Sequence, residues 1–330
     1  TICAATHGIL RRIMGNDRKE TPMERISLDI ALVILHFNTV NETNNLVISI
    51  KQKIDAKNYK IVIVDNKSPN GSGAEIQQTY KDDYLVDVVL NPENIGFARG
   101  NNAGIDFVRA NYDAKYICCL NNDTLMIQDN FYRVLDEEYR MSGAAVVMVK
   151  SCLPDGSVSG WVRHFWSLEA YKEKYDTYAC KLCLMPLTYR VKHEIKRISS
   201  ELAKFLHLCT SQPQRPYLNP ECRHEDITAS GCCVIFTPLF FQKLKGFDNR
   251  TFLYWEEELL HLALKKNELL SVYNPNLYIK HLESVSTKTF AKKKKERKML
   301  VTQHLFNSLH VFIDEFEKLQ RENFEKNCRD

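Results

Sequence analysis

Asp123 ends the polar triplet Asn-Asn-Asp that directly follows an apolar stretch, in the segment YICCLNNDTL that runs from Tyr116 to Leu125. A buried strand that ends in Asn-Asn-Asp brings polar side chains to its carboxyl end. A carboxylate flanked by amide and hydroxyl groups suits a hard divalent cation such as Mg²⁺ or Mn²⁺. Such a cation could neutralise the charge of a leaving diphosphate. An Asx-turn, in which Asp123 caps its own loop, also explains these residues.

Two earlier segments carry polar groups at corresponding places. Asp65 ends the apolar run KIVIV, where its carboxylate could accept hydrogen bonds from a base or ribose, or could cap a turn. The segment NPENIGFARGNNAGI (residues 91–105) contains three glycines spaced four residues apart. Small residues at a helix start let phosphate or sugar approach the backbone, although the segment is neither GxGxxG nor a P-loop. Its Arg99 could neutralise phosphate or pair with a surface acid.

Acidic and imidazole groups follow in the second half. FLYWEEELLHLALKK (residues 252–266) has three consecutive glutamates, which could complement a helix dipole or supply a general base for an attacking hydroxyl. Because successive helical residues point about 100° apart, Glu256, Glu257 and Glu258 cannot all face one site. His281, in YIKHLESVS, could complete the shell of a metal at the strand end, or could be structural.

The expected elements bring the early segments to one edge of a sheet. Apolar runs predict strands and amphipathic stretches predict helices, in the order strand 30–37, helix 45–57, strand 60–64, helix 74–80, strand 86–90, helix from about 94 to 110, strand 116–120. This alternation predicts a parallel sheet, whose ligands bind outside the carboxyl ends of the strands. Polar residues follow four of these strands: Asn38, Asp65-Asn66, Asn91 and Asn121-Asn122-Asp123.

The pattern changes after Val149. Residues 161–228 are rich in aromatic and basic residues, with a helix expected at 191–208. A strand is expected at 231–236, a turn and helix at 247–266, and a largely helical stretch from 292 to about 324.

Composition limits the class of protein. The chain has 330 residues, 44% of them hydrophobic, and a net charge of +4. One large core, or a core with a smaller appended layer, is therefore expected, and a nucleic-acid partner is not. The eleven cysteines, several of them in apolar runs, predict reduced thiols in a cytosolic protein. Cys180 and Cys183 form a CxxC without a second pair to complete a zinc site. No apolar stretch is long enough to span a bilayer.

Both ends of the chain are distinctive. Residues 1–22 make a poor signal peptide and are expected to lie outside the core, with Met23 as a candidate start. The run AKKKKERK (residues 291–298) predicts either a solvated helix face or a contact with an anionic membrane. We therefore expect a cytoplasmic protein, with peripheral attachment to the inner face of the membrane through Lys292–Lys298 as a hypothesis.

Taken in order, these motifs resemble the inverting family-2 glycosyltransferases of the GT-A fold. The likeness is greatest to bacterial rhamnosyltransferase-like and galactofuranosyltransferase-like members. It spans about residues 26–286 and rests on ALVILHFNT, IVIVDNKSPNGS, NIGFARGNNAGI, ICCLNNDT, SGCCVIFTP, GFDNRTFLYWEEELL and HLESVS. It implies an α/β, GT-A (Rossmann-like) fold: a mostly parallel central sheet flanked by helices, with a helical C-terminal extension.

The resemblance also implies roles for individual residues. Glu257 would be the catalytic base with Glu256 beside it, Trp255 would stack on an acceptor sugar, and Asp123 and His281 would hold Mn²⁺ or Mg²⁺. The donor would be bound by Asn38, Asp65 (at the base), Asn94, Gly96, Arg99, Asn101 and Asn122. Residues 23–150 would form the nucleotide-sugar-binding half, residues 151–290 the acceptor-binding and catalytic half, and residues 291–330 a basic, amphipathic helical tail.

Three positions depart from the family pattern. Asn121 replaces the first acid of the DxD motif, Glu257 stands where Asp is usual, and Leu259 replaces a further acid. The first departure could lower metal affinity, and the last could alter acceptor contacts.

The implied activity is that of a metal-dependent hexosyltransferase (EC 2.4). A sugar would pass from dTDP-rhamnose or a UDP-sugar to a hydroxyl of a glycan or lipid-linked oligosaccharide, in the synthesis of a surface polysaccharide. Two alternatives stay open. A sugar nucleotidyltransferase normally needs a Gly-rich, basic loop after its first strand, which HFNTVNETNN does not provide. A non-catalytic nucleotide-sugar-binding relative would be consistent with Asn121 and Leu259.

Overall fold

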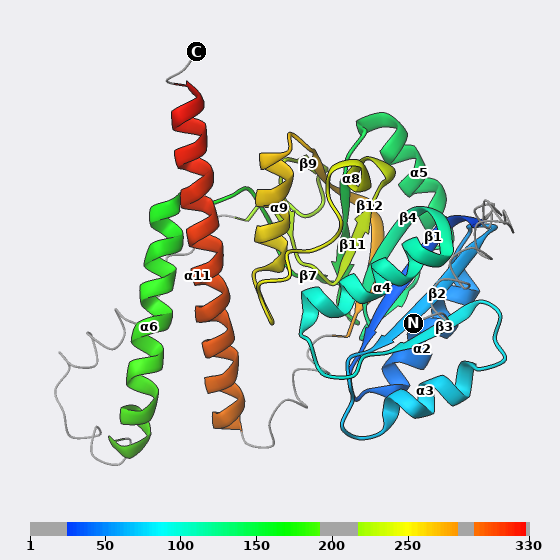
Figure 1. Cartoon of the computed structure of the whole chain (residues 1–330), viewed down its shortest axis with the longest axis horizontal. Coiled ribbons are helices and arrows are strands. Elements are labelled where there is room, and N and C mark those ends of the chain that lie inside the picture. The colour runs from blue at the N-terminus through cyan, green and yellow to red at the C-terminus, as the bar shows by residue number, and fades with distance from the viewer. Residues whose placement is uncertain (1–24, 192–216, 283–293, 328–330) are drawn as a thin grey trace, which may run out of the picture.

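A ten-stranded sheet organises the chain in the computed structural model, which describes residues 25–191, 217–282 and 294–327 (Figure 1). Its main path runs β3-β2-β1-β4-β11-β6-β12-β5, with β7 beside β6 and β9 beside β12. The strands are β1 (Ile26–His36), β2 (Tyr59–Asp65), β3 (Val86–Leu90), β4 (Tyr112–Asn121), β5 (Thr124–Met126), β6 (Val146–Cys152), β7 (Val158–Ser159), β9 (His224–Glu225), β11 (Cys233–Phe236) and β12 (Ser271–His281). A separate pair is formed by β8 (Val162–Arg163) and β10 (Thr228–Ala229).

The first four strands of the path are parallel, as the alternation of strands and helices predicts. Leu35 of β1 pairs with Asn121 of β4, and His36 pairs with Asp65 of β2, so the polar strand ends lie at one edge. Strand β11 runs antiparallel between β4 and β6, whereas β12 is parallel to β6. A mostly parallel central sheet is therefore confirmed, and it joins both halves of the chain.

Helices cover both faces of the sheet. One face packs against α2 (Val40–Lys53), α3 (Ser72–Tyr80) and α5 (Phe131–Ser142), and the other against α4 (Phe97–Asn111), α8 (Pro238–Lys243) and α9 (Glu256–Lys266). In β1, Ile30, Leu32 and Ile34 face the first group of helices, and Ala31 and Val33 face the second. All five are fully buried, which explains the continuous apolar run of this strand.

Two long helices lie side by side beyond α9 (Figure 1): α6 (Leu168–Val191) and α11 (Lys294–Asn327). They pack on α9 through a third apolar cluster that includes Tyr171, Leu259 and Phe312. The expected helical C-terminal extension is thus confirmed. Helix α6 was not expected, because aromatic and basic residues obscure its periodicity. The helix expected at 191–208 falls outside the described residues except for Val191.

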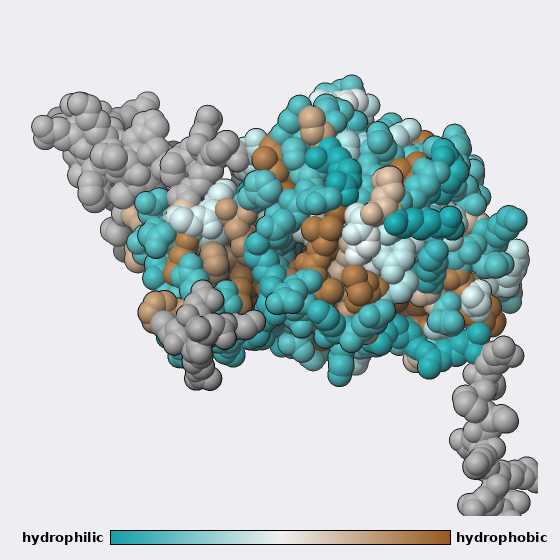
Figure 2. Space-filling view, turned by 90° about the horizontal axis from the view of Figure 1, so that it is seen from above, coloured by the Kyte–Doolittle hydropathy of each residue, from teal (hydrophilic) through white to brown (hydrophobic). Residues whose placement is uncertain are grey.

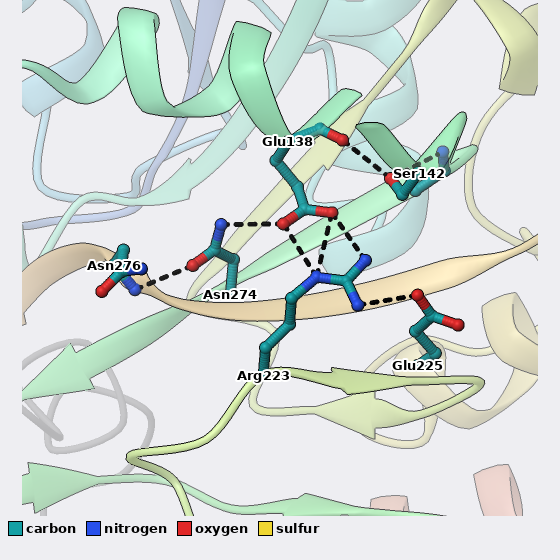
Figure 3. Close-up of polar contacts among 7 residues, drawn as sticks. Glu138, Ser142, Arg223, Glu225, Asn274 and Asn276 are labelled. Atoms are coloured by element: carbon teal, nitrogen blue, oxygen red, sulfur yellow. Dashed lines mark hydrogen bonds and ion pairs between the residues drawn. The ribbon is translucent and has the colours of Figure 1, made fainter. Parts of the chain in front are cut away.

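A buried carboxylate fixes strand β12 (Figure 3). Glu138 of α5 is fully buried and accepts hydrogen bonds from Arg223, at 2.8 to 3.2 Å, and from Asn274 Nδ2, at 2.9 Å. Asn274 stands at an irregularity in β12, where the register with β6 shifts before Tyr278. Because β12 then continues to His281, the Glu138 cluster stabilises the strand that carries this histidine to the sheet edge.

The outer surface is mostly polar. Figure 2 shows a largely hydrophilic face on which apolar residues form separate patches. Exposed large apolar residues of α11 include Met299, Leu300 and Phe324. None of the described helices combines the length and the apolar character needed to cross a membrane.

Candidate active site

A cavity of about 440 Å³ opens at the carboxyl edge of the parallel strands, where the sequence predicts a site. Its lining comes from segments far apart in the chain. They are the ends of β1 and β4, the loops after β2 and β3, the segment before β11, the start of α9 and the end of β12. The lining residues that concern the chemistry are Asn66, Asn94, Gly96, Asn121, Asn122, Asp123, Gly231, Glu256, Glu257 and His281.

Asp123 and His281 meet at this edge. The Nε2 atom of His281 lies 3.3 Å from Oδ1 of Asp123, and both side chains are largely buried. Pairing between β12 and β5, with His281 opposite Thr124, fixes the distance between their backbones. The Leu282 N–H also donates to the Asp123 carbonyl at 2.8 Å. The two residues that the family resemblance pairs as metal ligands are therefore brought together.

The donor atoms at this point fit a divalent cation whose shell is completed by a ligand. Among the described residues, no three or more His, Cys, Asp or Glu side chains are grouped to hold a metal, so Asp123 and His281 would supply only two ligands and a bound molecule would have to supply the others. In addition, His281 Nδ1 is buried without a hydrogen-bond partner. The described cavity lining contains three carboxyl groups and neither Lys nor Arg. A diphosphate entering here would therefore need a cation as counter-charge.

Glu257 faces the cavity from the first turn of α9. Its Oε1 accepts a hydrogen bond of 2.9 Å from the Gly231 N–H. A Cβ at position 231 would lie 2.3 Å from that oxygen, so this close approach requires glycine. The preceding residues, Tyr254 (φ 73°) and Trp255 (φ 69°), both adopt the left-handed conformation. The helix that carries Glu257 thus begins from a strained turn.

The three glutamates have different environments, as their spacing on a helix requires. Glu256 and Glu257 line the cavity, whereas Glu258 forms a buried ion pair with Arg163. Burial, with a smaller contribution from Glu258, raises the pKa of Glu257 to about 7. Burial and the neighbouring Glu257 raise the pKa of Glu256 well above its ordinary value. Of the two cavity glutamates, Glu257 is the one poised to exchange a proton near neutral pH.

Asn66 holds the part of the cavity wall formed by Asn94 and Gly96 through hydrogen bonds. This role was not predicted from the sequence. Its Nδ2 donates to Asn94 Oδ1 at 2.9 Å and to the Gly96 carbonyl at 3.0 Å, and its Oδ1 accepts from the Ile95 N–H at 3.1 Å. Gly96 has a φ of 86°, and a Cβ there would lie 2.3 Å from the Phe252 carbonyl oxygen. The only sequence signal for Asn66 was its position in the polar pair after β2.

Three predicted donor residues do not line the described cavity. Asp65 is 5% exposed and accepts hydrogen bonds from the Ser68 amide and from its hydroxyl at 2.5 Å, which is the turn-capping arrangement. The exposed Arg99 donates from Nε to the Asn249 carbonyl at 2.9 Å. Asn101 is buried and donates to the Phe97 carbonyl within α4 at 3.1 Å.

Two further predicted contacts lie outside this lining. Asn38 has a φ of 66°, and its amide N–H donates to Ser68 Oγ at 2.9 Å. Trp255 is 6% exposed, and its ring stacks on Phe312 of α11 with centroids 6.1 Å apart. Its indole therefore belongs to the apolar contact between α9 and α11.

Asn122 lines the cavity and also belongs to a polar network beneath it. Its Nδ2 donates to Thr39 Oγ1 at 2.6 Å and to Thr43 Oγ1 at 3.0 Å. Thr43 Oγ1 lies 2.7 Å from His36 Nδ1, and the other ring nitrogen lies 2.9 Å from Ser72 Oγ. Burial lowers the pKa of His36, which favours a neutral ring. The network thus fixes Asn122 through hydrogen bonds to β1, α2 and α3.

Comparison with known proteins agrees with this geometry. Residues 32–191, a little under half of the chain, match the family model described as Glycosyl transferase family 2. The sequence has no significant match among the curated proteins. The family match supports a glycosyltransferase, in EC 2.4 broadly.

A solved structure of GalNAc-T7 has a similar fold. "GalNAc-T7 with UDP, GalNAc and Mn2+" aligns with a TM-score of 0.51 and 14% identity, over 79% of this chain and 46% of that chain. S. aureus TarS 1-349 aligns at 0.46 and 11% identity, over 86% and 72% respectively. Its complex with UDP-GlcNAc aligns at 0.33 and 14% identity, over 39% and 36%. The chain thus spans less than half of two of these three structures, and the likeness establishes a GT-A-like fold only.

Proposed function

We propose that the protein is an inverting glycosyltransferase that uses a nucleotide-diphosphate sugar. One observation carries the proposal: the Asp123–His281 pair and the Gly231-bound Glu257 face the same cavity. A carboxylate–imidazole pair suits a cation that holds a diphosphate. A carboxyl with a pKa of about 7 suits a general base.

In the proposed reaction, Glu257 accepts the proton of the acceptor hydroxyl. The acceptor oxygen attacks the anomeric carbon and forms the new glycosidic bond. The bond from that carbon to the diphosphate oxygen breaks, and the nucleoside diphosphate leaves with the electron pair. Because this is one displacement from the opposite side, the configuration inverts. The Gly231 N–H orients the base by binding one carboxylate oxygen.

We propose Asp123 and His281 as the protein ligands of the cation. A mixed oxygen and nitrogen pair suits Mn²⁺, whereas Mg²⁺ prefers oxygen ligands. When bound, the cation supplies positive charge that stabilises the diphosphate. Asn121, in place of the usual acid, supplies no charge to this site.

The residues that contact the sugar donor are proposed from those that line the cavity. Asn94, Gly96 and Asn122 stay candidate donor contacts, and Asn66 joins them. For Asn38, Asp65, Arg99 and Asn101, donor contact would require a rearrangement on binding. Trp255 would likewise have to leave Phe312 to stack on an acceptor sugar.

The finer assignment also stays a proposal. The donor would be dTDP-rhamnose or a UDP-sugar, and the acceptor a glycan or lipid-linked oligosaccharide of a surface polysaccharide. Residues 23–150 would bind the donor, and residues 151–290 would supply the base and the acceptor contacts. A peripheral membrane contact would be made through Lys292–Lys298. Residues 292 and 293 of this run lie outside the described residues.

A nucleotide-binding panel tests the proposal. Thermal unfolding is measured with UDP, dTDP, GDP and CDP, each with and without Mn²⁺. A ligand at 100 times its dissociation constant adds about 2.7 kcal/mol of stability. We expect one nucleotide to raise the unfolding temperature, and to do so only with Mn²⁺. If none of the four binds to folded protein, the donor site is refuted.

The two alternatives predict different products. A nucleotidyltransferase would form a nucleotide sugar from a nucleoside triphosphate and a sugar phosphate, with release of pyrophosphate. A non-catalytic relative would show the Mn²⁺-dependent shift without consuming any nucleotide sugar. Chromatography of the nucleotides after incubation with UDP-GlcNAc or dTDP-rhamnose, with and without pyrophosphate, separates these outcomes: transfer or hydrolysis releases nucleoside diphosphate, whereas a nucleotidyltransferase forms nucleoside triphosphate only when pyrophosphate is present.

A further inference from the structure

The wall that leads to Glu257 is held from outside the sheet domain. Residues 250–255, here called the wall segment, form the last part of the connection between α8 and α9. Phe252, Leu253 and Tyr254 of this segment line the cavity. The segment ends in the two left-handed residues described above, which L-residues adopt only when neighbouring contacts enforce it. The question is which contacts do so.

Helix α11 supplies contacts at four points along the wall segment. Arg250 Nη1 lies 2.9 Å from Glu315 Oε2, and Ser308 Oγ donates to the Leu253 carbonyl at 2.8 Å. The Phe252 ring stacks on His304 with centroids 5.0 Å apart, and the Trp255 ring stacks on Phe312.

The burial of the two polar contacts indicates how much each contributes to holding the wall segment. Ser308 is 3% exposed, so loss of its hydroxyl leaves the Leu253 carbonyl without this donor in a closely packed interface. The Arg250–Glu315 pair is partly exposed, and Arg250 also pairs with Asp248, so it contributes less by itself. Ser308 is therefore the principal polar contact, and Glu315 supports it.

We infer that α11 positions the candidate base: Ser308 and Glu315 hold the wall segment in the conformation that directs Glu257 into the cavity. This inference rests on the proposed function for its catalytic meaning. Ser308 and Glu315 are positioning residues, because they act through Leu253 and Arg250 and do not line the described cavity. The C-terminal helix thereby supports the reaction site from outside the cavity.

The chain offers a matched control for each contact. Thr302 is also a buried hydroxyl of α11, but it bonds to the Lys298 carbonyl of its own helix at 2.8 Å. Glu317 is also a glutamate of α11, but it pairs with Lys172 of α6 at 2.6 Å. Ser308→Ala is therefore compared with Thr302→Val, and Glu315→Gln with Glu317→Gln.

Hydrogen exchange of the full chain gives the first readout and needs no substrate. In Ser308→Ala combined with Glu315→Gln, we expect amides of residues 250–259 to exchange roughly tenfold faster, while those of β1 and β4 stay unchanged. Thr302→Val combined with Glu317→Gln should leave residues 250–259 as in the wild type. Equal exchange in both double variants would overturn the inference.

Hydrolysis of UDP-GlcNAc or dTDP-rhamnose with Mn²⁺ gives the second readout. Ser308→Ala combined with Glu315→Gln should lower kcat roughly tenfold. It should also move the acid limb of the pH profile to lower pH, because a loosened wall segment admits water to Glu257 and so lowers its pKa. The stability loss of a merely structural contact would not move that limb. An unchanged kcat and acid limb would refute the positioning role.

Glu257→Gln separates this inference from the proposed function. If that variant keeps wild-type turnover, the proposed role of Glu257 as the base fails. If it is inactive while both double variants behave alike, only the role of α11 fails. Should the wild type hydrolyse neither sugar nucleotide, the exchange comparison alone decides whether α11 holds the wall segment.

Discussion

The imidazole of His281 lies 3.3 Å from the carboxylate of Asp123, although the two residues come from opposite halves of the chain. The antiparallel pairing of β12 with β5 produces this contact. Each residue alone is compatible with a structural role. Together, in a cavity whose described lining has no basic side chain other than His281, they form the most suitable place for a cation.

Substitution of either residue should remove the metal dependence of nucleotide binding. In Asp123→Asn and in His281→Gln, we expect the Mn²⁺-dependent thermal shift with UDP or dTDP to disappear and turnover to fall at least about 100-fold. His310→Gln is the control, because His310 is an exposed residue that pairs with Asp314 on α11. Mn²⁺-dependent binding that survives in both test variants would place the cation elsewhere.

Turnover should follow the ionisation of Glu257. A general base must be deprotonated, and its pKa is raised to about 7, so activity should rise with pH and level off above about 7. Glu257→Gln should reduce turnover at least about 100-fold while nucleotide binding stays within about twofold. A pH profile of kcat in the wild type and nucleotide titrations of the variant check this. Wild-type activity in Glu257→Gln would assign the base to another group.

The same carboxyl should make stability depend on pH. Its folded pKa of about 7 lies above the ordinary value of 4.5, so between these values the folded state binds more protons than the unfolded state. The contribution of Glu257 to the free energy of unfolding therefore falls as pH rises from about 4.5 to about 7. Glu257→Gln should remove part of this decline, as measured by urea unfolding at pH 5 and pH 7. A pH dependence identical to that of the wild type would contradict the raised pKa.

Gly231→Ala should misplace the base without emptying the donor site. The added Cβ would lie 2.3 Å from Glu257 Oε1, so the carboxylate must move away from the Gly231 N–H. We expect at least a tenfold loss of kcat with nucleotide binding intact. Gly143→Ala is a stability control, because the added Cβ meets no atom within 4 Å although the left-handed backbone is strained. Equal effects of the two substitutions on kcat would argue against the contact.

Local patterns predicted the sheet edge well but predicted individual contacts poorly. The apolar runs predicted β1 to β4, and their alternation with helices predicted that they are parallel, so the polar carboxyl ends, including Asp123, were expected at one edge. Whether a polar side chain faces the cavity depends on its loop. Asp65 closes a turn with Ser68, whereas the adjacent Asn66 holds the cavity wall. The left-handed turn before α9 and the packing of Trp255 on α11 depend on contacts distant in sequence.

Arg223→Ala should destabilise the fold more than loss of its exposed partner does. Glu138 is fully buried, and without Arg223 its carboxylate would keep only Asn274 and an uncompensated charge (Figure 3). Breaking such a pair costs about 3 kcal/mol, or somewhat less because Arg223 is partly exposed. Glu225→Gln removes only the exposed ion pair and should cost less than about 1 kcal/mol. Urea unfolding of both variants measures the difference. Equal losses would show that Glu138 does not depend on Arg223 and that β12 is fixed by other contacts.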